Sequence, residues 1–93
     1  MSYINKDYPL SELTGKIIGC AMEVHSVLGN GFQEKIYHRA FSMELQEANL
    51  HFLHEFEMEI HYKNRILGKR RVDFFVENKI MVELKAVIQM EDV

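Results

Sequence analysis

The 93-residue chain lacks tryptophan and contains only one proline and one cysteine. A single cysteine, Cys20, excludes an internal disulfide framework and suits a reducing compartment, and its apolar neighbours indicate a core position. No segment approaches the roughly 18 consecutive apolar residues that a membrane-spanning helix needs. The first residues also lack the apolar stretch of a signal peptide. We therefore expect one small cytoplasmic domain over residues 1–93.

The net charge of −3 does not favour a dedicated nucleic-acid-binding protein. Residues 61–71 (HYKNRILGKRR), however, contain no acid and carry a local charge of +5, so that the rest of the chain carries −8. The five cations are Lys63, Arg65, Lys69, Arg70 and Arg71. Two interpretations remain open, namely a local binding site for a polyanion and an ordinary solvated hairpin.

Two segments have helical periodicity. The apolar stripe of the first repeats every three or four residues and consists of Leu10, Leu13, Ile17, Ala21, Val24 and Leu28. Pro9 suits an early helical position, and residues 29–31 (Gly-Asn-Gly) accept the left-handed backbone that ends a helix. We expect Asn30 to cap a second helix, with Gln33 as its capping-box partner, that ends near Asn49. Its broad stripe predicts a well-buried helix: Phe32, Ile36, Tyr37, Ala40, Phe41, Met43, Leu45 and Ala48.

From residue 52 the period of the pattern changes to two, which predicts a half-buried strand over residues 52–62. Its even positions form the inward face and are Phe52, His54, Phe56, Met58, Ile60 and Tyr62. A turn at residues 63–65 and a bend or bulge at Gly68 precede a second strand over residues 70–77. A third strand is expected over residues 80–87. The order predicts an α+β fold in which two N-terminal helices pack on a three-stranded antiparallel sheet.

The register of the last hairpin follows from its apolar residues, since paired residues share a face. A three-residue loop over residues 77–79 pairs Val76 with Ile80, keeps the apolar face continuous and requires a positive φ at Asn78. This register places Asp73 opposite Glu83. Lys85 then lies two positions further along the same face.

Facing carboxylates repel each other unless a positive group lies between them. The candidates are Lys85, another basic side chain and Mg²⁺, which favours one or two carboxylates together with water and phosphate oxygens. On the second helix, Glu34 shares a face with the aromatic residues Tyr37 and Phe41, where an unpaired carboxylate is costly. Glu34 is therefore either a structural partner of a lysine from the sheet or a further ligand at the patch of Asp73 and Glu83.

Asp73 followed by Glu83-Leu84-Lys85, with Glu34 on an earlier helix, resembles the active-site pattern of the PD-(D/E)XK nuclease superfamily. The wider sequence is more specific. Residues 13–41 (LTGKIIGCAMEVHSVLGNGFQEKIYHRAF), the basic hairpin and the segment MVELKAV strongly resemble the small bacterial GxxExxY family of that superfamily. Gly31, Glu34 and Tyr37 supply its motif, and the similarity covers about residues 10–90.

This resemblance implies that Asp73, Glu83 and the backbone carbonyl of Leu84 bind Mg²⁺ or Mn²⁺, with Glu34 as a helical acid of the same site. Lys85 would position or activate the attacking water. Val72 stands where the motif usually has proline, and valine suits a strand.

The function implied is a metal-dependent phosphodiester hydrolase acting on nucleic acid, with DNA favoured and the five cations of residues 61–71 holding the backbone. The alternative is a non-catalytic nucleic-acid-binding or protein-assembly module that retains the fold. Members of this family usually continue with a further helix and strand. We therefore expect a truncated PD-(D/E)XK-like core, either a fragment or a homodimer that covers the open sheet edge.

Overall fold

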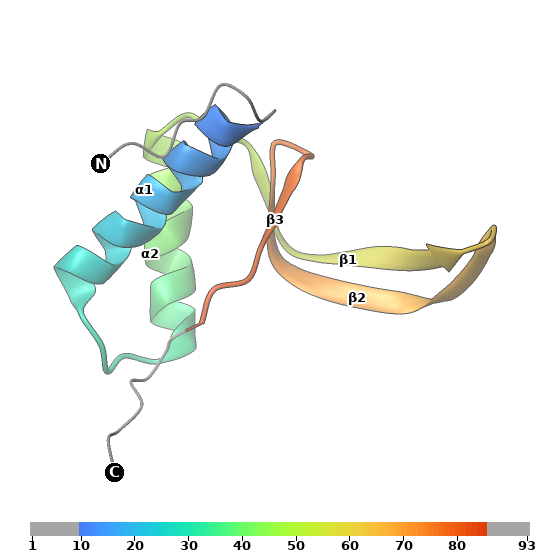
Figure 1. Cartoon of the computed structure of the whole chain (residues 1–93). Helices are drawn as coiled ribbons and strands as arrows, with labels where there is room; N and C mark the ends of the chain where they lie inside the picture. Colours follow the sequence, from blue (N-terminus) through green and yellow to red (C-terminus); the bar gives the residue numbers. More distant parts are fainter. Residues whose placement is uncertain (1–9, 86–93) are drawn as a thin grey trace, which may run out of the picture. The chain divides into compact units, whose positions relative to one another are not determined.

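The computed structural model describes residues 10–85 (Figure 1). Its elements, in chain order, are α1 (Ser11–Leu28), α2 (Glu34–Glu47), β1 (Phe52–Tyr62), β2 (Arg65–Val76) and β3 (Ile80–Val82). The described chain forms two compact units, residues 10–49 with Lys85, and Leu50–Leu84. Two helices followed by a three-stranded antiparallel sheet confirm the expected α+β class. Within residues 10–85, neither helix has the length and apolar character needed to cross a membrane.

Helix α1 follows the expected stripe in its middle and departs from it at its start. Ile17, Cys20 and Val24 are buried at spacings of three and four, whereas Leu10 is exposed and precedes the helix. The helix ends at Gly29, whose φ of 68° is left-handed and whose amide donates to the carbonyl of His25 at 2.8 Å. Pro9, expected at an early helical position, lies outside the described residues.

Helix α2 begins later than the sequence suggested. Its N-cap is Gln33, without a side-chain hydrogen bond, so the prediction that Asn30 caps the helix is wrong. Gly31, with a φ of 107°, belongs instead to a loop that separates α1 from α2. The buried residues of α2 are His38, Phe41 and Leu45, while Phe32 and Met43 are exposed. The buried stripe is therefore narrower than predicted.

The first hairpin joins β1 and β2 through a two-residue turn. Lys63 and Asn64 both have positive φ, 49° and 66°, as in the turns that match the twist of a hairpin. Tyr62 therefore pairs with Arg65, and β2 begins five residues before the expected start of this strand at residue 70. A register shift follows, because Ile60 pairs with Gly68 and His61 with Ile66. Leu67 is the extra residue of this bulge, next to the glycine where one was expected.

The second hairpin has the predicted register. Val76 pairs with Ile80 and Phe74 with Val82, and Asn78 has a φ of 53°. Val72, Phe74 and Val76 are completely buried, so the predicted apolar face of β2 is part of the core. Strand β3 is shorter than predicted, because it ends at Val82 and residues 83–85 are not in a strand. Residues 86–87 of the expected strand lie outside the described residues.

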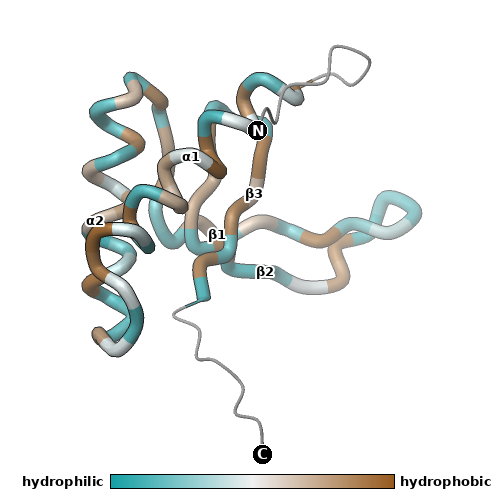
Figure 2. Tube along the Cα trace, turned by 60° about the vertical axis from the view of Figure 1, so that its left-hand side comes forward, coloured by the Kyte–Doolittle hydropathy of each residue, from teal (hydrophilic) through white to brown (hydrophobic). Residues whose placement is uncertain are grey.

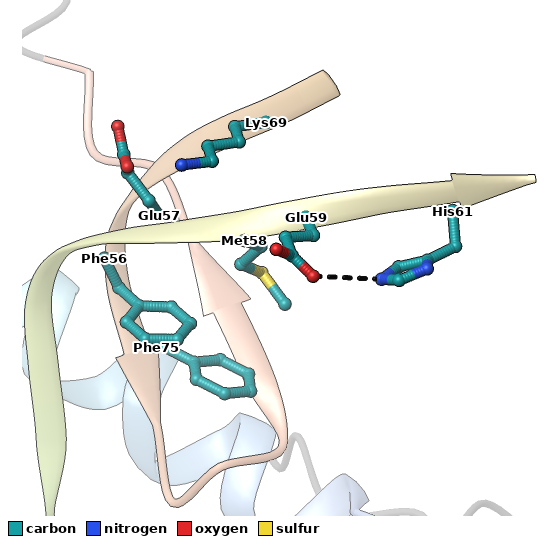
Figure 3. A pocket seen from close by; sticks show the side chains of 7 residues that line it. All are labelled: Phe56, Glu57, Met58, Glu59, His61, Lys69 and Phe75. Carbon is teal, nitrogen blue, oxygen red and sulfur yellow. Dashed lines mark ion pairs between the residues drawn. The ribbon is translucent and has the colours of Figure 1, made fainter. Parts of the chain in front are cut away.

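The inward face of β1 is interrupted halfway along the strand. The rings of Phe52 and His54 contact the ring of Phe74, whereas Phe56 stacks on Phe75 at 5.4 Å between ring centroids (Figure 3). Between them, Glu55 has a positive φ of 58°, which is rare for a residue with a side chain inside a strand. The single apolar face predicted for β1 therefore extends only through its first residues.

The far end of the β1–β2 hairpin is two-stranded. Strand β3 pairs only with residues 74–76, so β1 and β2 continue beyond it toward their shared turn (Figure 1). Ile60 and Tyr62, predicted to face inward, are 44% and 57% exposed. Figure 2 shows hydrophilic residues around the turn itself.

Candidate metal and nucleic-acid site

Asp73 is attached to the Glu83-Leu84-Lys85 segment by a hydrogen bond. The backbone amide of Leu84 donates to Oδ2 of the partly buried Asp73 at 2.8 Å. Since β3 ends at Val82, the amide of Leu84 is not paired in the sheet, and it donates its hydrogen bond to the carboxylate of Asp73 instead. The structure thus brings together two parts of the predicted site that are 11 residues apart in the sequence.

Glu83 has a different partner. Its Oε1 lies 3.4 Å from Nη2 of Arg70, and the two side chains are 38% and 51% exposed. Arg70 is thus a basic side chain beside Glu83, which is one of the positive groups considered for this patch. The paired register stops at Phe74 and Val82, one step before Asp73 and Glu83 would face each other. An ion pair this exposed stabilises the fold by about 0–1 kcal/mol, so a competing cation can displace it.

Glu34 begins α2, and its side chain is 59% exposed rather than buried. The expectation that Glu34 needs a charged partner because its carboxylate is buried is therefore wrong. In the described chain, its Oε2 lies 4.0 Å from Nε2 of His38 on the same helix. His38 is itself buried, and it is not among the site residues predicted from the sequence. Its spacing of four from Glu34 and three from Phe41 is the signal that could have identified it.

The hydrogen bonds of Tyr37 explain why a tyrosine stands three residues after Glu34. Its hydroxyl donates to the carbonyl of Gly29 at 2.6 Å and accepts from the amide of Phe32 at 3.2 Å. The ring also makes an edge contact with the ring of Phe32. Tyr37 thus fixes the loop between α1 and α2, directly before the helix that carries Glu34.

Lys85 directly follows Leu84 and is exposed. Together with Glu34 it belongs to the unit of residues 10–49 and 85, whereas Asp73, Glu83 and Leu84 belong to the sheet unit. Within these units, the structure brings Asp73 to Leu84, Glu83 to Arg70 and Glu34 to His38.

The five cations of the basic segment differ in their surroundings. Arg71 pairs with Glu55 at 2.8 Å and Arg70 with Glu83. The ammonium group of Lys63 lies 5.3 Å from the ring centroid of Tyr62. In the described part of the chain, Lys63, Arg65 and Lys69 have no carboxylate within ion-pair distance. Of these three cations, Lys63 and Arg65 therefore lie at and beside the turn, and Lys69 lies within β2, midway between Arg65 and Asp73 in the sequence.

Two groups outside the candidate site have shifted pKa values. Burial, with a contribution from the charge of Glu44, raises the pKa of the Cys20 thiol, so it is protonated at neutral pH and is not an activated nucleophile. The amide and ring of His51 hydrogen-bond to Glu77 and lower the pKa of its carboxyl group. Neither shift indicates catalytic chemistry.

The donor set around Asp73 fits a hard divalent cation. Mg²⁺ and Mn²⁺ prefer carboxylate and carbonyl oxygens, and they retain water ligands when the protein supplies only a few such donors. The hydrogen bond from Leu84 restricts the orientation of the Asp73 carboxylate. The Glu83 carboxylate already lies beside a positive group. Asp73 and the Glu83-Leu84 segment thus offer carboxylate and carbonyl oxygens of the kind that such an ion binds, with the Glu83 carboxylate paired to Arg70 in this structure.

Comparison with known protein families identifies a match for this chain. No curated protein and no solved structure matches the chain significantly. The family model of the PD-(D/E)XK nuclease superfamily matches residues 11–93, which is most of the chain. The match includes the helix of Glu34, the strand of Asp73 and the Glu83-Leu84-Lys85 segment. The chain therefore belongs to the PD-(D/E)XK nuclease superfamily.

Proposed function

We propose that the protein is a Mg²⁺- or Mn²⁺-dependent nuclease that hydrolyses phosphodiester bonds, with DNA as the favoured substrate. The observation that carries the proposal is the hydrogen bond between Asp73 and the amide of Leu84, in a chain of the PD-(D/E)XK nuclease superfamily. It links the acid of β2 to the segment that contains Glu83 and Lys85, as a shared site requires.

In this proposal, Asp73, Glu83 and the carbonyl of Leu84 hold the metal ion, and Glu34 is the acid contributed by α2. When bound, the ion supplies positive charge that lowers the pKa of a water and stabilises the phosphate. The amide of Leu84 keeps the Asp73 carboxylate oriented. The ammonium group of Lys85 donates hydrogen bonds to the attacking water or to the phosphate.

The finer assignment to the GxxExxY family belongs to the same proposal. Its support is the loop before α2, where Gly31 has a left-handed φ and the hydroxyl of Tyr37 bonds to Gly29 and Phe32. These contacts give the glycine and the tyrosine of the motif structural roles. Glu34, between them, has an exposed carboxylate that is available for chemistry.

The five cations of residues 61–71 bind the nucleic-acid backbone in this proposal. Contacts with phosphates release counterions, so binding should weaken steeply with salt and depend little on sequence. Lys63, Arg65 and Lys69 are free to make such contacts at once. Arg70 and Arg71 must first leave Glu83 and Glu55.

Cleavage of supercoiled plasmid and of labelled single strands, with Mg²⁺, Mn²⁺ or EDTA, tests the proposal. Wild type should cleave only with metal, and Lys85→Ala and Asp73→Asn should each reduce the rate by about 100-fold or more. Lys79→Ala is the matched control, since Lys79 is an exposed lysine in the turn between β2 and β3.

No metal-dependent cleavage, or equal cleavage by wild type and Lys85→Ala, would reject the catalytic role. If the protein then still bound nucleic acid in EDTA, the alternative of a non-catalytic binding module would hold.

A further inference from the structure

Residues 57–71 form the outer part of the β1–β2 hairpin, which we name the arm. It is two-stranded, because β3 pairs only with residues 74–76. Four large apolar side chains of the arm are exposed by 44–64%: Ile60, Tyr62, Ile66 and Leu67. Exposed apolar residues of this kind, grouped at the end of a hairpin, indicate a contact surface.

The register divides the arm into two faces of different charge. Tyr62 pairs with Arg65 and Met58 with Arg70, and Ile60 lies between them opposite Gly68. Paired residues share a face, and successive residues alternate between faces. One face of the arm therefore carries the side chains of Met58, Ile60, Tyr62, Arg65 and Arg70. Within the arm, that face contains two arginines and no acid, and of the two Arg70 is paired with Glu83 outside the arm whereas Arg65 is not in an ion pair within the described chain.

The opposite face of the arm carries both signs of charge. Glu57 pairs with Arg71 and Glu59 with Lys69, while His61 pairs with Ile66. Nε2 of His61 also lies 3.3 Å from Oε1 of Glu59 (Figure 3). Two acids on this face make it less suited to lie against base edges than the face of Tyr62 and Arg65, and its cations Lys69 and Arg71 remain for contacts with flanking phosphates.

The dimensions of the arm match a groove of double-stranded DNA. From Glu57 to Tyr62 it is about 17 Å long, at about 3.3 Å per residue, and its two strands are about 4.8 Å apart. The major groove of B-DNA is about 12 Å wide and 8.5 Å deep and accommodates a two-stranded ribbon. The cations Lys63 and Arg65, at and beside the turn, would then lie near phosphates.

We propose that the arm binds in the major groove of duplex DNA, with the face of Ile60, Tyr62 and Arg65 toward the base edges. This inference rests on the proposed function for its nucleic-acid substrate, and it adds the form of that substrate and the element that engages it. Arg65 meets acceptors of base edges or phosphates, and the side chains of Ile60 and Tyr62 contact bases and thymine methyl groups.

Fluorescence anisotropy in EDTA tests the inference without cleavage. The probes are a labelled 20-base-pair duplex, its single strand, and the same duplex with glucosylated hydroxymethylcytosine, which fills the major groove. Wild type should bind the plain duplex about tenfold more tightly than either other probe, and the minor-groove ligand netropsin should not compete.

Two matched variants separate the faces of the arm. Tyr62→Ser should weaken duplex binding by about tenfold, whereas Ile66→Ser, an equally exposed apolar residue on the opposite face, should change it by less than about twofold. Thermal melts followed by circular dichroism verify that both variants fold. Equal losses in the two variants, or equal binding of all three probes, would overturn the inference.

Failure of the inference is distinguishable from failure of the proposed function. Metal-dependent cleavage together with equal binding of the three probes rejects the groove contact and leaves the nuclease intact. Groove-dependent binding without cleavage rejects the nuclease alone. Binding to phosphatidylserine vesicles with no binding to any nucleic acid would assign the arm to a lipid surface and overturn the inference.

Discussion

Among single residues, Tyr37 holds the loop before α2 through its hydroxyl group. It donates to Gly29 and accepts from Phe32, at a position that is partly buried. Tyr37→Phe leaves these two backbone groups without their partner. It should lower the free energy of unfolding by about 1–2 kcal/mol, measured by urea denaturation.

Tyr62→Phe is the control for this change, because Tyr62 is exposed and its ring contact with Lys63 does not involve the hydroxyl. Its free energy of unfolding should stay within about 0.5 kcal/mol of wild type. Equal stability of the Tyr37→Phe variant and wild type would contradict the role of the hydroxyl.

Glu77 connects the start of β1 to the end of β2. Its Oε2 accepts from the amide of His51 at 2.7 Å, and this bond, more than the ring contact, lowers the pKa of the carboxyl group from its ordinary 4.5. A lowered folded-state pKa stabilises the fold above the unfolded-state pKa, and the contribution is lost as the pH falls through the folded value.

As the pH decreases below about 5, the free energy of unfolding of wild type should therefore decrease. The free energy of unfolding of Glu77→Gln should decrease less steeply over the same range. Urea denaturation between pH 3 and pH 7 measures the slope. Glu57→Gln, which removes an exposed carboxylate of β1, is the control, and an unchanged slope in Glu77→Gln would count against the prediction.

At the scale of elements, the second hairpin depends on the backbone of its turn. Asn78 has a φ of 53°, which asparagine and glycine tolerate and β-branched residues do not. Asn78→Val should lower the free energy of unfolding by about 1–2 kcal/mol, whereas Asn78→Gly should stay close to wild type. Thermal denaturation measures both. A valine variant as stable as the glycine variant would show that the turn has another conformation.

Hairpin register could be predicted from sequence because apolar residues on paired strands must share a face. This argument correctly paired Val76 with Ile80, and alternation correctly placed β1 at Phe52–Tyr62. The start of β2 was missed because Lys63-Asn64 is a weak turn signal, although both residues adopt positive φ. The short β3 was missed because a continuing apolar pattern does not reveal that Asp73 accepts the amide of Leu84.

The candidate site was predictable to a smaller extent. The proximity of Asp73 to the Glu83-Leu84-Lys85 segment followed from the register. The exposure of Glu34 and the pairing of Arg70 with Glu83 depend on side-chain packing, which the period of a pattern does not encode. His38 could have been found, since it stands one helical turn after Glu34.

At the scale of the whole molecule, the pairing of Arg70 with Glu83 connects the basic segment to the proposed metal site. A metal ion that binds Glu83 must displace this guanidinium, so part of its binding free energy is spent on separating the pair. For an exposed pair this amounts to about 0–1 kcal/mol. Arg70→Gln should therefore tighten Mn²⁺ binding by up to about fivefold, measured by isothermal titration calorimetry without nucleic acid.

Arg71→Gln is the matched control, because it removes the neighbouring arginine, whose partner Glu55 is not a proposed ligand. Its Mn²⁺ affinity should equal that of wild type, whereas Glu83→Gln and Asp73→Asn should lose most of the binding. Displacement of Arg70 from Glu83 by the metal ion also affects DNA binding, since the Arg70 guanidinium can contact a phosphate only after it has left Glu83. With the inert ion Ca²⁺ at the same concentration in both samples, the salt dependence of DNA binding should therefore be steeper by about one counterion in wild type than in Arg70→Gln, and the two should be equal in EDTA. Weaker metal binding in Arg70→Gln would mean that the guanidinium supports the site rather than competing for it.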